Sequence, residues 1–227
     1  MKTSILIMAA VLCAPAAPPA AEPLRIGVAG VSHGHIHEVI SKAHRGDFTV
    51  VGVWEANDSL RAATHLHDKV DGALFYADLD RMLDQTQPEA VVAFGPVYDH
   101  LQVVEACAPR GIHVMVEKPL AVSVEHAHRI ADLARRYGII VMTNYETTWY
   151  ATNDEAFRLV RAGVIGEITR MNIFDGHQGP VEIGCGPEFL AWLTDPKLNG
   201  GGAVLGLERS HGFRMLWRQP RHEDVPR

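Results

Sequence analysis

The sequence predicts an α/β fold, in which a doubly wound parallel sheet is followed by an incomplete α+β domain. Two observations lead to this prediction. Six apolar, strand-like segments alternate with helix-like segments over short connections, which is typical of βαβ units. The strand-like segments are apolar throughout, as expected for a sheet that helices cover on both faces. Right-handed crossovers then place a ligand crevice at the carboxyl ends of the strands.

The individual elements follow from hydrophobic runs and the residues that flank them. Asp78 has the short polar side chain of a helix N-cap, and Gly163 would end a later helix. After residue 174 a stretch rich in glycine and proline predicts loops. The expected strands are residues 24–31, 48–54, 73–76, 90–94, 112–116, 139–142 and 168–174, and the expected helices are 35–44, 59–67, 78–84, 99–108, 124–137 and 154–162.

The composition is that of a globular protein, and its charge argues against one class of partner. Hydrophobic residues make up 47% of the chain and charged residues 21%, which suffices to bury a core. The net charge of −6 lacks the basic surplus of nucleic-acid-binding proteins, so we expect no nucleic-acid partner. After the first 21 residues the chain has two cysteines, Cys107 and Cys185. Two are too few to predict a disulfide framework.

The first 21 residues have the pattern of a secretory signal peptide. Lys2 precedes an apolar run over residues 5–12, and small residues follow with a cleavage option at Ala14 and Ala16. The run is shorter than the roughly 18–20 apolar residues that cross a bilayer. We expect cleaved export to the periplasm and no membrane span. A lipid anchor at Cys13 is less favoured, because Leu12 is too large for that signal.

The turn after the first strand is a candidate site for a dinucleotide. The known fingerprint has three glycines, for a tight turn, for approach to the pyrophosphate and for helix packing. In register, Gly30 takes the first place, Ser32 the second and His35 the third, while Gly34 lies out of register. We expect these four residues and His33 to line a cofactor. An ordinary strand-to-helix turn is the alternative.

Glu55 supports the cofactor interpretation. It ends the second strand, close to the spacing of about 20 residues expected after the glycine turn. An acid there accepts hydrogen bonds from the adenosine ribose and disfavours a 2′-phosphate. The sequence therefore predicts NAD, with NADP less favoured, since Arg61 lies far along the next expected helix.

Glu117-Lys118-Pro119 follows the fifth expected strand directly and is the most specific motif in the chain. A charged pair at that strand end points into the crevice, where burying charge costs several kcal/mol unless the charge is paired or used. The tripeptide resembles the hallmark of the glucose–fructose oxidoreductase/inositol dehydrogenase (Gfo/Idh/MocA) family. The resemblance covers about residues 24–203, including segments 93–96, 143–150 and 186–193.

The resemblance implies a Rossmann domain over residues 22–143 and a partial α+β substrate domain over residues 144–206. It implies an NAD(P)-dependent oxidoreductase for a sugar or polyol derivative, with Lys118 as the catalytic residue that contacts the substrate hydroxyl. Intact members form homo-oligomers, which is doubtful for this chain. The residues expected beside the cofactor on this ground are Phe94, Gly95, Pro96, His100, Glu117 and Lys118.

The resemblance stops after the glycine-rich segment 200–203. The family continues with Leu-x-Asp-x-Gly-x-His or Tyr, but the corresponding positions hold Gly206, Glu208 and Ser210, and His211 comes one residue late. Residues 207–227 contain five arginines and no helix or strand period. We therefore expect an aberrant, frameshifted tail and a truncated protein that is reduced to nucleotide binding.

Two other functions stay open at this point. Some relatives hydrolyse glycosides with a tightly held NAD and no net oxidation, which the fold cannot distinguish. The pattern His33-x-His35-x-His37 resembles the His-x-His of metal-dependent hydrolases. Further histidines such as His100 and His113 lack an acidic partner at a strand end, so the sequence predicts no metal site.

The reading frame after Gly202 provides the first test. We expect that one inserted or deleted base, found by sequencing the DNA across this point, restores the family's Asp-x-Gly-x-His/Tyr motif and a longer chain. An intact frame would contradict the frameshift hypothesis. It would leave Lys118 without its expected partners.

Overall fold

The computed structural model describes residues 22–200, except residues 64, 146, 147, 149, 171 and 173–177. The predicted signal peptide, the predicted tail and the positions expected to hold the partners of Lys118 lie outside the described residues. Within them, no helix is both long enough and apolar enough to cross a membrane.

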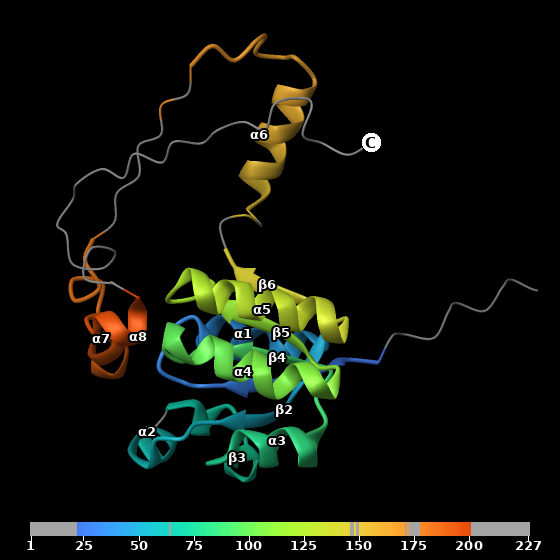
Figure 1. Cartoon of the computed structure of the whole chain (residues 1–227). Helices are drawn as coiled ribbons and strands as arrows, with labels where there is room; N and C mark the ends of the chain where they lie inside the picture. Colours follow the sequence, from blue (N-terminus) through green and yellow to red (C-terminus); the bar gives the residue numbers. More distant parts are fainter. Residues whose placement is uncertain are drawn as a thin grey trace, which may run out of the picture.

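Six parallel strands form one sheet in the order β3-β2-β1-β4-β5-β6 (Figure 1). The order reverses between β1 and β4, which is the point where open α/β sheets bind ligands. The doubly wound parallel sheet predicted from the sequence is therefore confirmed. The strands are β1 Leu24–Ala29, β2 Phe48–Trp54, β3 Phe75–Tyr76, β4 Ala90–Ala93, β5 His113–Glu117 and β6 Val141–Asn144.

Helices cover both faces of the sheet, which explains why its strands are apolar throughout. One core contains Met82 and Leu83 of α3, Val104 of α4 and Leu133 of α5. The other contains Ile36 of α1 and neighbouring residues. The connecting helices are α1 Ile36–Lys42, α2 Asp58–Ala63, α3 Leu79–Thr86, α4 His100–Cys107 and α5 Val124–Tyr137.

Two glycines let α3 approach the sheet closely. A Cβ atom at Gly52 would lie 2.8 Å from Cγ of Met82, and one at Gly27 would lie 3.2 Å from Cε of the same side chain. Met82 is fully buried against both strands. A larger residue at Gly52 would push α3 away from the sheet.

The last two strands lie later in the chain than predicted. The sequence predicted residues 112–116 and 139–142, whereas β5 is His113–Glu117 and β6 is Val141–Asn144. Ile139 is instead used to close α5, because its N–H donates to the carbonyl of Ala134 after Gly138 adopts a left-handed conformation. The shift pairs Glu117 with Asn144 at the carboxyl edge of the sheet.

The region after β6 differs more from the prediction. Residues 168–170 and 172 form no strand, and the rest of the strand expected over 168–174 lies outside the described residues. Part of the expected loop is helical: α7 is Pro187–Leu193 and α8 is Pro196–Asn199, and each begins with a proline, which suits the first helical turn. The helix expected over 154–162 is α6, Ala151–Arg161.

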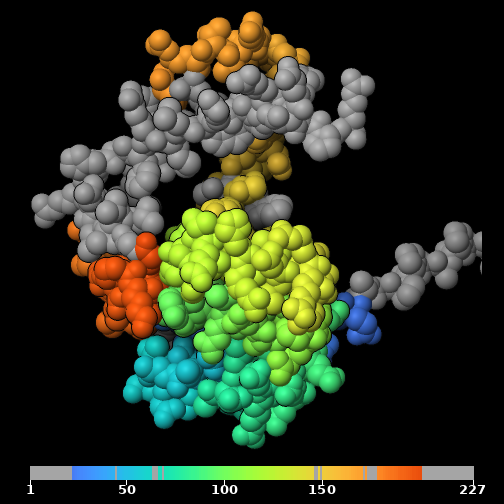
Figure 2. All heavy atoms as spheres, in the orientation of Figure 1, coloured from blue at the N-terminus to red at the C-terminus, as the bar shows by residue number. Residues whose placement is uncertain are grey.

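The two short helices return to the first domain, whereas α6 does not. No residue of α6 is buried, and Figure 1 shows it standing apart from the sheet. Figure 2 shows α7 and α8, in orange-red, against the green atoms of the sheet domain. Trp192 of α7 and Asn199 of α8 are each only 5% exposed. This return brings residues distant in sequence to the carboxyl edge of the sheet.

The predicted N-cap at Asp78 is confirmed and can be tested. Its carboxylate accepts the backbone N–H of Arg81 at 2.7 Å. We expect Asp78→Ala to lower the free energy of unfolding by about 1 kcal/mol in urea denaturation. Asp78→Asn keeps the acceptor and serves as the control. Equal stability of the Ala and Asn variants would contradict the capping role.

Candidate active site

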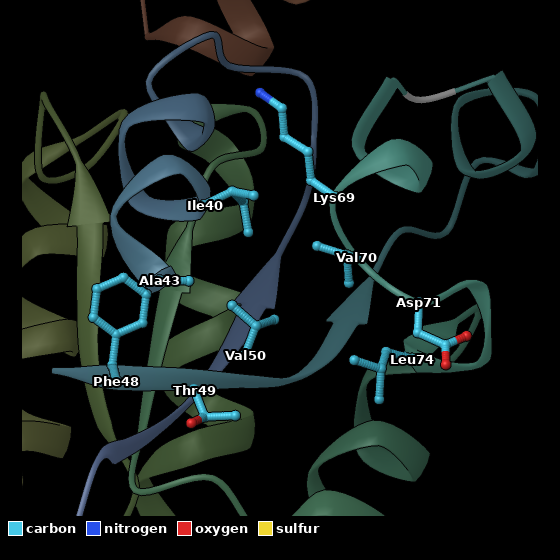
Figure 3. A pocket seen from close by; sticks show the side chains of 9 residues that line it. All are labelled: Ile40, Ala43, Phe48, Thr49, Val50, Lys69, Val70, Asp71 and Leu74. Carbon is cyan, nitrogen blue, oxygen red and sulfur yellow. The ribbon is translucent and has the colours of Figure 1, made fainter. Parts of the chain in front are cut away.

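The residues predicted to carry the chemistry meet at the carboxyl edge of the sheet. A separate hollow lies at the amino-terminal half of β2, between α1 and the segment around Val70 (Figure 3). Thr49 and Val50 line that hollow, at the opposite end of the strand from Glu55. The candidate site is therefore the strand edge and not this hollow.

The backbone of the first turn is tied to the loop that follows β4. Gly30 has a φ of +80°, and a Cβ atom there would lie 2.5 Å from the backbone nitrogen of Gly95. The N–H of His33 donates to the carbonyl of Phe94 at 2.9 Å. Only glycine fits at position 30, as predicted. Gly34 is exposed with open space around its Cα, so packing does not require a glycine there.

Glu55, the residue expected to bind the ribose, lies against this turn. Its Oε2 accepts the N–H of Val31 at 3.2 Å, and its Oε1 accepts the N–H of Asn57 at 2.9 Å. A carboxylate has about four acceptor positions, so the two oxygens keep capacity for further donors. Arg61 is closer than expected, because its guanidinium donates to the carbonyl oxygen of Glu55 at 2.7 Å and pairs with Asp58.

Asp99 is a second acid in this corner, which the sequence analysis did not single out. It ends the 3₁₀ helix η4, Val97–Asp99, in the loop after β4. Burial raises the pKa of the Asp99 carboxyl, and the nearby negative charge of Glu55 raises it further. Two acidic groups thus lie close together at this corner, which suits hydroxyl groups better than an additional phosphate.

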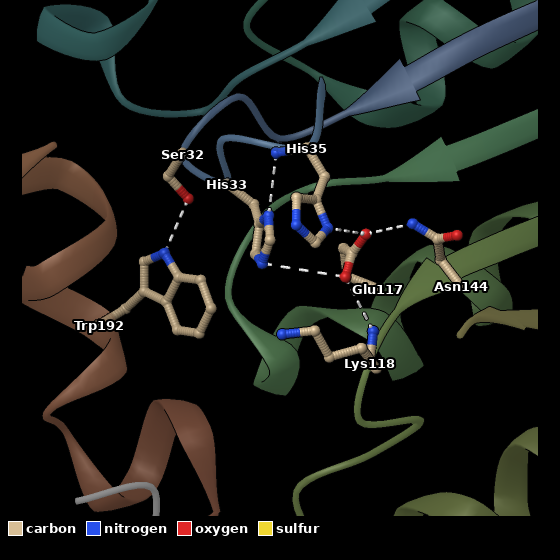
Figure 4. Close-up of polar contacts among 7 residues, drawn as sticks. All are labelled: Ser32, His33, His35, Glu117, Lys118, Asn144 and Trp192. Atoms are coloured by element: carbon tan, nitrogen blue, oxygen red, sulfur yellow. Dashed lines mark hydrogen bonds and ion pairs between the residues drawn. The ribbon is translucent and has the colours of Figure 1, made fainter. Parts of the chain in front are cut away.

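A hydrogen-bonded network joins the ends of β1, β5 and β6 around Glu117 (Figure 4). The Glu117 side chain is 1% exposed. Its Oε1 accepts Nδ1–H of His35 at 3.0 Å and the side-chain amide of Asn144, and its Oε2 accepts the N–H of Lys118 at 3.1 Å. Burial raises the pKa of this carboxyl, but the hydrogen bonds from His35 and Asn144 help to hold the pKa below its usual value.

His33 and His35, which the sequence analysis weighed as metal ligands, lie beside Glu117 in this network. The side-chain atoms of His33, His35 and Glu117 that could ligate a metal ion lie within 4.8 Å of one another. However, Nδ1 of His33 accepts the N–H of His35, so the hydrogen of a neutral His33 ring is on Nε2, which faces Glu117 at 3.8 Å. A metal ligand would need a lone pair on Nε2. The hydrogen bonds therefore favour a proton-linked network over a metal centre.

Lys118 lies at the same edge and is exposed. Its peptide bond to Pro119 is cis. Figure 4 shows its side chain extending past Glu117 toward His33. Lys118 is thus the exposed cation of the site, while the adjacent Glu117 is enclosed by donors.

Three residues expected beside the cofactor also make contacts that support the loops of the site. Phe94 is 0% exposed and belongs to the core beneath the turn. His100 is also 0% exposed, and its Nδ1 is hydrogen-bonded to the carbonyl of Leu120 at 3.1 Å. Pro96 directly precedes η4 as its N-cap, with its carbonyl accepting the N–H of Asp99. These contacts hold the loops on which the site is built.

The structure also adds residues that sequence reasoning missed. Asn144 would have been found if the sixth strand had been extended by two residues. Trp192 donates its Nε1–H to Oγ of Ser32 at 2.9 Å across 160 positions of sequence. Its segment was noted only for its resemblance, and no local pattern indicates this contact.

Two buried histidines predict acid sensitivity. Burial lowers the pKa of His33 and of His100 from 6.5 to about 4. Between these values the unfolded chain binds more protons than the folded one, so stability should fall as the pH drops from 6.5 to 4. We expect His100→Asn to flatten this dependence in urea unfolding at pH 7, 6 and 5. His128→Asn, at an exposed position of α5, is the matched control. A slope as steep as that of the parent chain would contradict the assignment.

Comparison with known proteins agrees with this geometry. The family described as "Oxidoreductase family, NAD-binding Rossmann fold" (GFO_IDH_MocA) matches residues 24–145. A dTDP-3,4-didehydro-2,6-dideoxy-alpha-D-glucose 3-reductase of Streptomyces antibioticus is 32% identical over 82% of the chain and 61% of its own length. D-glucoside 3-dehydrogenase of Escherichia coli (strain K12) is 26% identical over 86% of the chain and 52% of its own length. The chain thus spans little more than half of these relatives.

Solved structures agree on the fold. An inositol dehydrogenase homolog from Azotobacter vinelandii, complexed with NAD+, matches 79% of the chain and 49% of its own with a TM-score of 0.66 and 24% identity. The WlbA dehydrogenase from Bordetella pertussis, in complex with NADH and UDP-GlcNAcA, matches 62% of the chain and 43% of its own with a TM-score of 0.55 and 24% identity. Together with the family match over more than half of its residues, these findings show that the chain belongs to the Gfo/Idh/MocA family of oxidoreductases with an NAD-binding Rossmann fold.

Proposed function

We propose that this chain binds NAD. We further propose that its family pattern is that of an oxidoreductase that acts on a sugar or polyol derivative. One observation carries the proposal: the Gly30 turn, the acid Glu55 and the exposed cation Lys118 meet at one carboxyl edge of the sheet. The names of relatives that act on glucoside and deoxyglucose derivatives support the substrate class.

We call the corner formed by Glu55 and Asp99 the adenosine corner, because the adenosine of the cofactor is proposed to bind there. Its residues fit NAD. Glu55 accepts two backbone N–H groups and retains acceptor capacity for ribose hydroxyls. Asp99 adds a second acid nearby, so a 2′-phosphate would meet two carboxyl groups. Arg61 is the cation closest to this corner among those described above, and it already contacts Asp58 and the carbonyl of Glu55. This charge balance supports NAD over NADP.

Lys118 is the residue we assign to the substrate. Bound NAD would supply the hydride acceptor or donor. The Lys118 ammonium can hydrogen-bond a sugar hydroxyl and stabilise negative charge on its oxygen. Glu117 is a poor base for this purpose, because donors enclose both of its oxygens and its pKa is lowered. Its role is to hold Lys118 at the strand end.

The chain as written is proposed to bind the dinucleotide without turnover. Gly206 and Ser210 replace the acid and the His or Tyr that the family pattern places beside the lysine. Hydrolysis with transient oxidation stays a rival to net oxidation, because the fold does not distinguish the two. Export to the periplasm also stays a proposal, which the mass of the mature protein tests.

Glu55 provides the test of dinucleotide binding. We expect the full chain to bind NADH more tightly than NADPH. The Glu55→Gln variant should bind NADH about tenfold more weakly than the parent chain, since hydrogen bonds to charged groups contribute about 1.5–3 kcal/mol. Binding is measured by NADH fluorescence. Glu89→Gln is the matched control, because Glu89 also accepts a backbone N–H, that of Arg25, but at the other end of the sheet. Absence of NADH binding by the parent chain would sink the proposal.

A panel of sugars and polyols tests the reaction class. With NAD present, we expect no change in absorbance at the NADH band for this chain, and oxidation of at least one sugar once the family motif is restored after Ala203. In the restored protein Lys118→Ala should abolish oxidation and leave NADH binding intact. Release of product without net NADH would favour the hydrolytic rival.

A further inference from the structure

The proposed function gives no role to the hydrogen bond between Trp192 and Ser32. Ser32 occupies the second place of the dinucleotide turn, where the usual fingerprint has a glycine beside the pyrophosphate. Trp192 lies on α7, in the segment that returns to the first domain (Figure 4). Each residue is 5% exposed, so their hydrogen bond is shielded from water.

We propose that Trp192 is a positioning residue for the pyrophosphate of the dinucleotide, acting through the hydroxyl of Ser32. This inference rests on the proposed function. It assigns to the returning segment a part in cofactor binding, in addition to covering the first domain.

The chemistry of the two groups gives the contact a direction. An indole N–H can only donate, and a serine hydroxyl has one hydrogen to donate and two acceptor positions. Trp192 therefore occupies an acceptor position on Ser32 and leaves its O–H free to donate. None of the hydrogen bonds found among the described residues uses that hydrogen. Donation by the indole also polarises the hydroxyl and strengthens its bond to an anion.

Aromatic packing keeps α7 against the turn. The rings of His33 and Phe189 meet edge to face with centroids 4.8 Å apart, and those of Phe189 and Trp192 do the same at 4.8 Å. Replacing Trp192 by Phe keeps an aromatic ring in this cluster and removes only the N–H donor. The variant thus separates the hydrogen bond from the packing.

Three ligands of increasing length make the test specific. AMP reaches only the adenosine corner at Glu55, whereas ADP-ribose and NADH also carry the pyrophosphate. Affinities are measured by calorimetry on the full chain. We expect Trp192→Phe and Ser32→Ala each to lower the affinity for ADP-ribose and for NADH about fivefold to tenfold, which corresponds to roughly one hydrogen bond. The affinity for AMP should change less than twofold. The double variant should bind no more weakly than Ser32→Ala alone, because Trp192 is proposed to act through the hydroxyl that this variant removes.

Trp54→Phe is the matched control. Trp54 of β2 also donates a part-buried indole N–H, but to the carbonyl of Ala77 after β3, at 3.3 Å. Its loss should leave the ratio of ADP-ribose to AMP affinity unchanged. If Trp192→Phe fails to fold, an unchanged ADP-ribose affinity in Ser32→Ala still overturns the proposal, because Trp192 is proposed to act through that hydroxyl.

The outcomes separate this inference from the proposed function. Unchanged ADP-ribose affinity in Trp192→Phe, a parallel loss of AMP affinity, or additive effects in the double variant would overturn the positioning role while leaving NADH binding intact. A parent chain that binds none of the three ligands would overturn both.

Discussion

The buried carboxylate of Glu117 is the interaction on which the arrangement of the site depends. A carboxylate that is 1% exposed costs several kcal/mol unless donors surround it. The donors come from three places: His35 after β1, Asn144 at the end of β6, and the backbone of Lys118. Their convergence ties the end of β5 to its neighbour β6 and to the turn after β1. The same bonds fix the Glu117 carboxylate and leave the neighbouring Lys118 side chain exposed.

The site divides into two halves with different electrostatics. At the adenosine corner, Glu55 and Asp99 lie close enough for one to raise the pKa of the other. At the other half, Lys118 offers a positive charge beside a carboxylate that is already satisfied. Hydroxyl groups suit the first half, and an oxygen that develops negative charge suits the second. Between them lies the turn at Ser32, which α7 reaches through Trp192.

Much of the fold could be predicted because its signals are local. Apolar runs of strand length separated by helical segments appear in any short window, and parallel topology alone then gathers the carboxyl ends of the strands at one edge. Gly30, Glu55 and Lys118 could be assigned to one site on this basis. The ends of β5 and β6 could not, because the chain from Ile139 onward can either extend a strand or close a helix. Their register decided that Asn144 meets Glu117.

The sequence by itself determined the fold class, the order of the elements and the edge of the sheet that holds the candidate site, because periodicity and motif spacing are properties of neighbouring residues. Only the tertiary structure decided what each side chain does there. Phe94 and His100 follow a strand that ends at the site, yet both are fully buried and support loops. Trp192 reaches Ser32 from 160 positions away. Burial and hydrogen-bond partners arise from packing between distant segments, which no local pattern encodes.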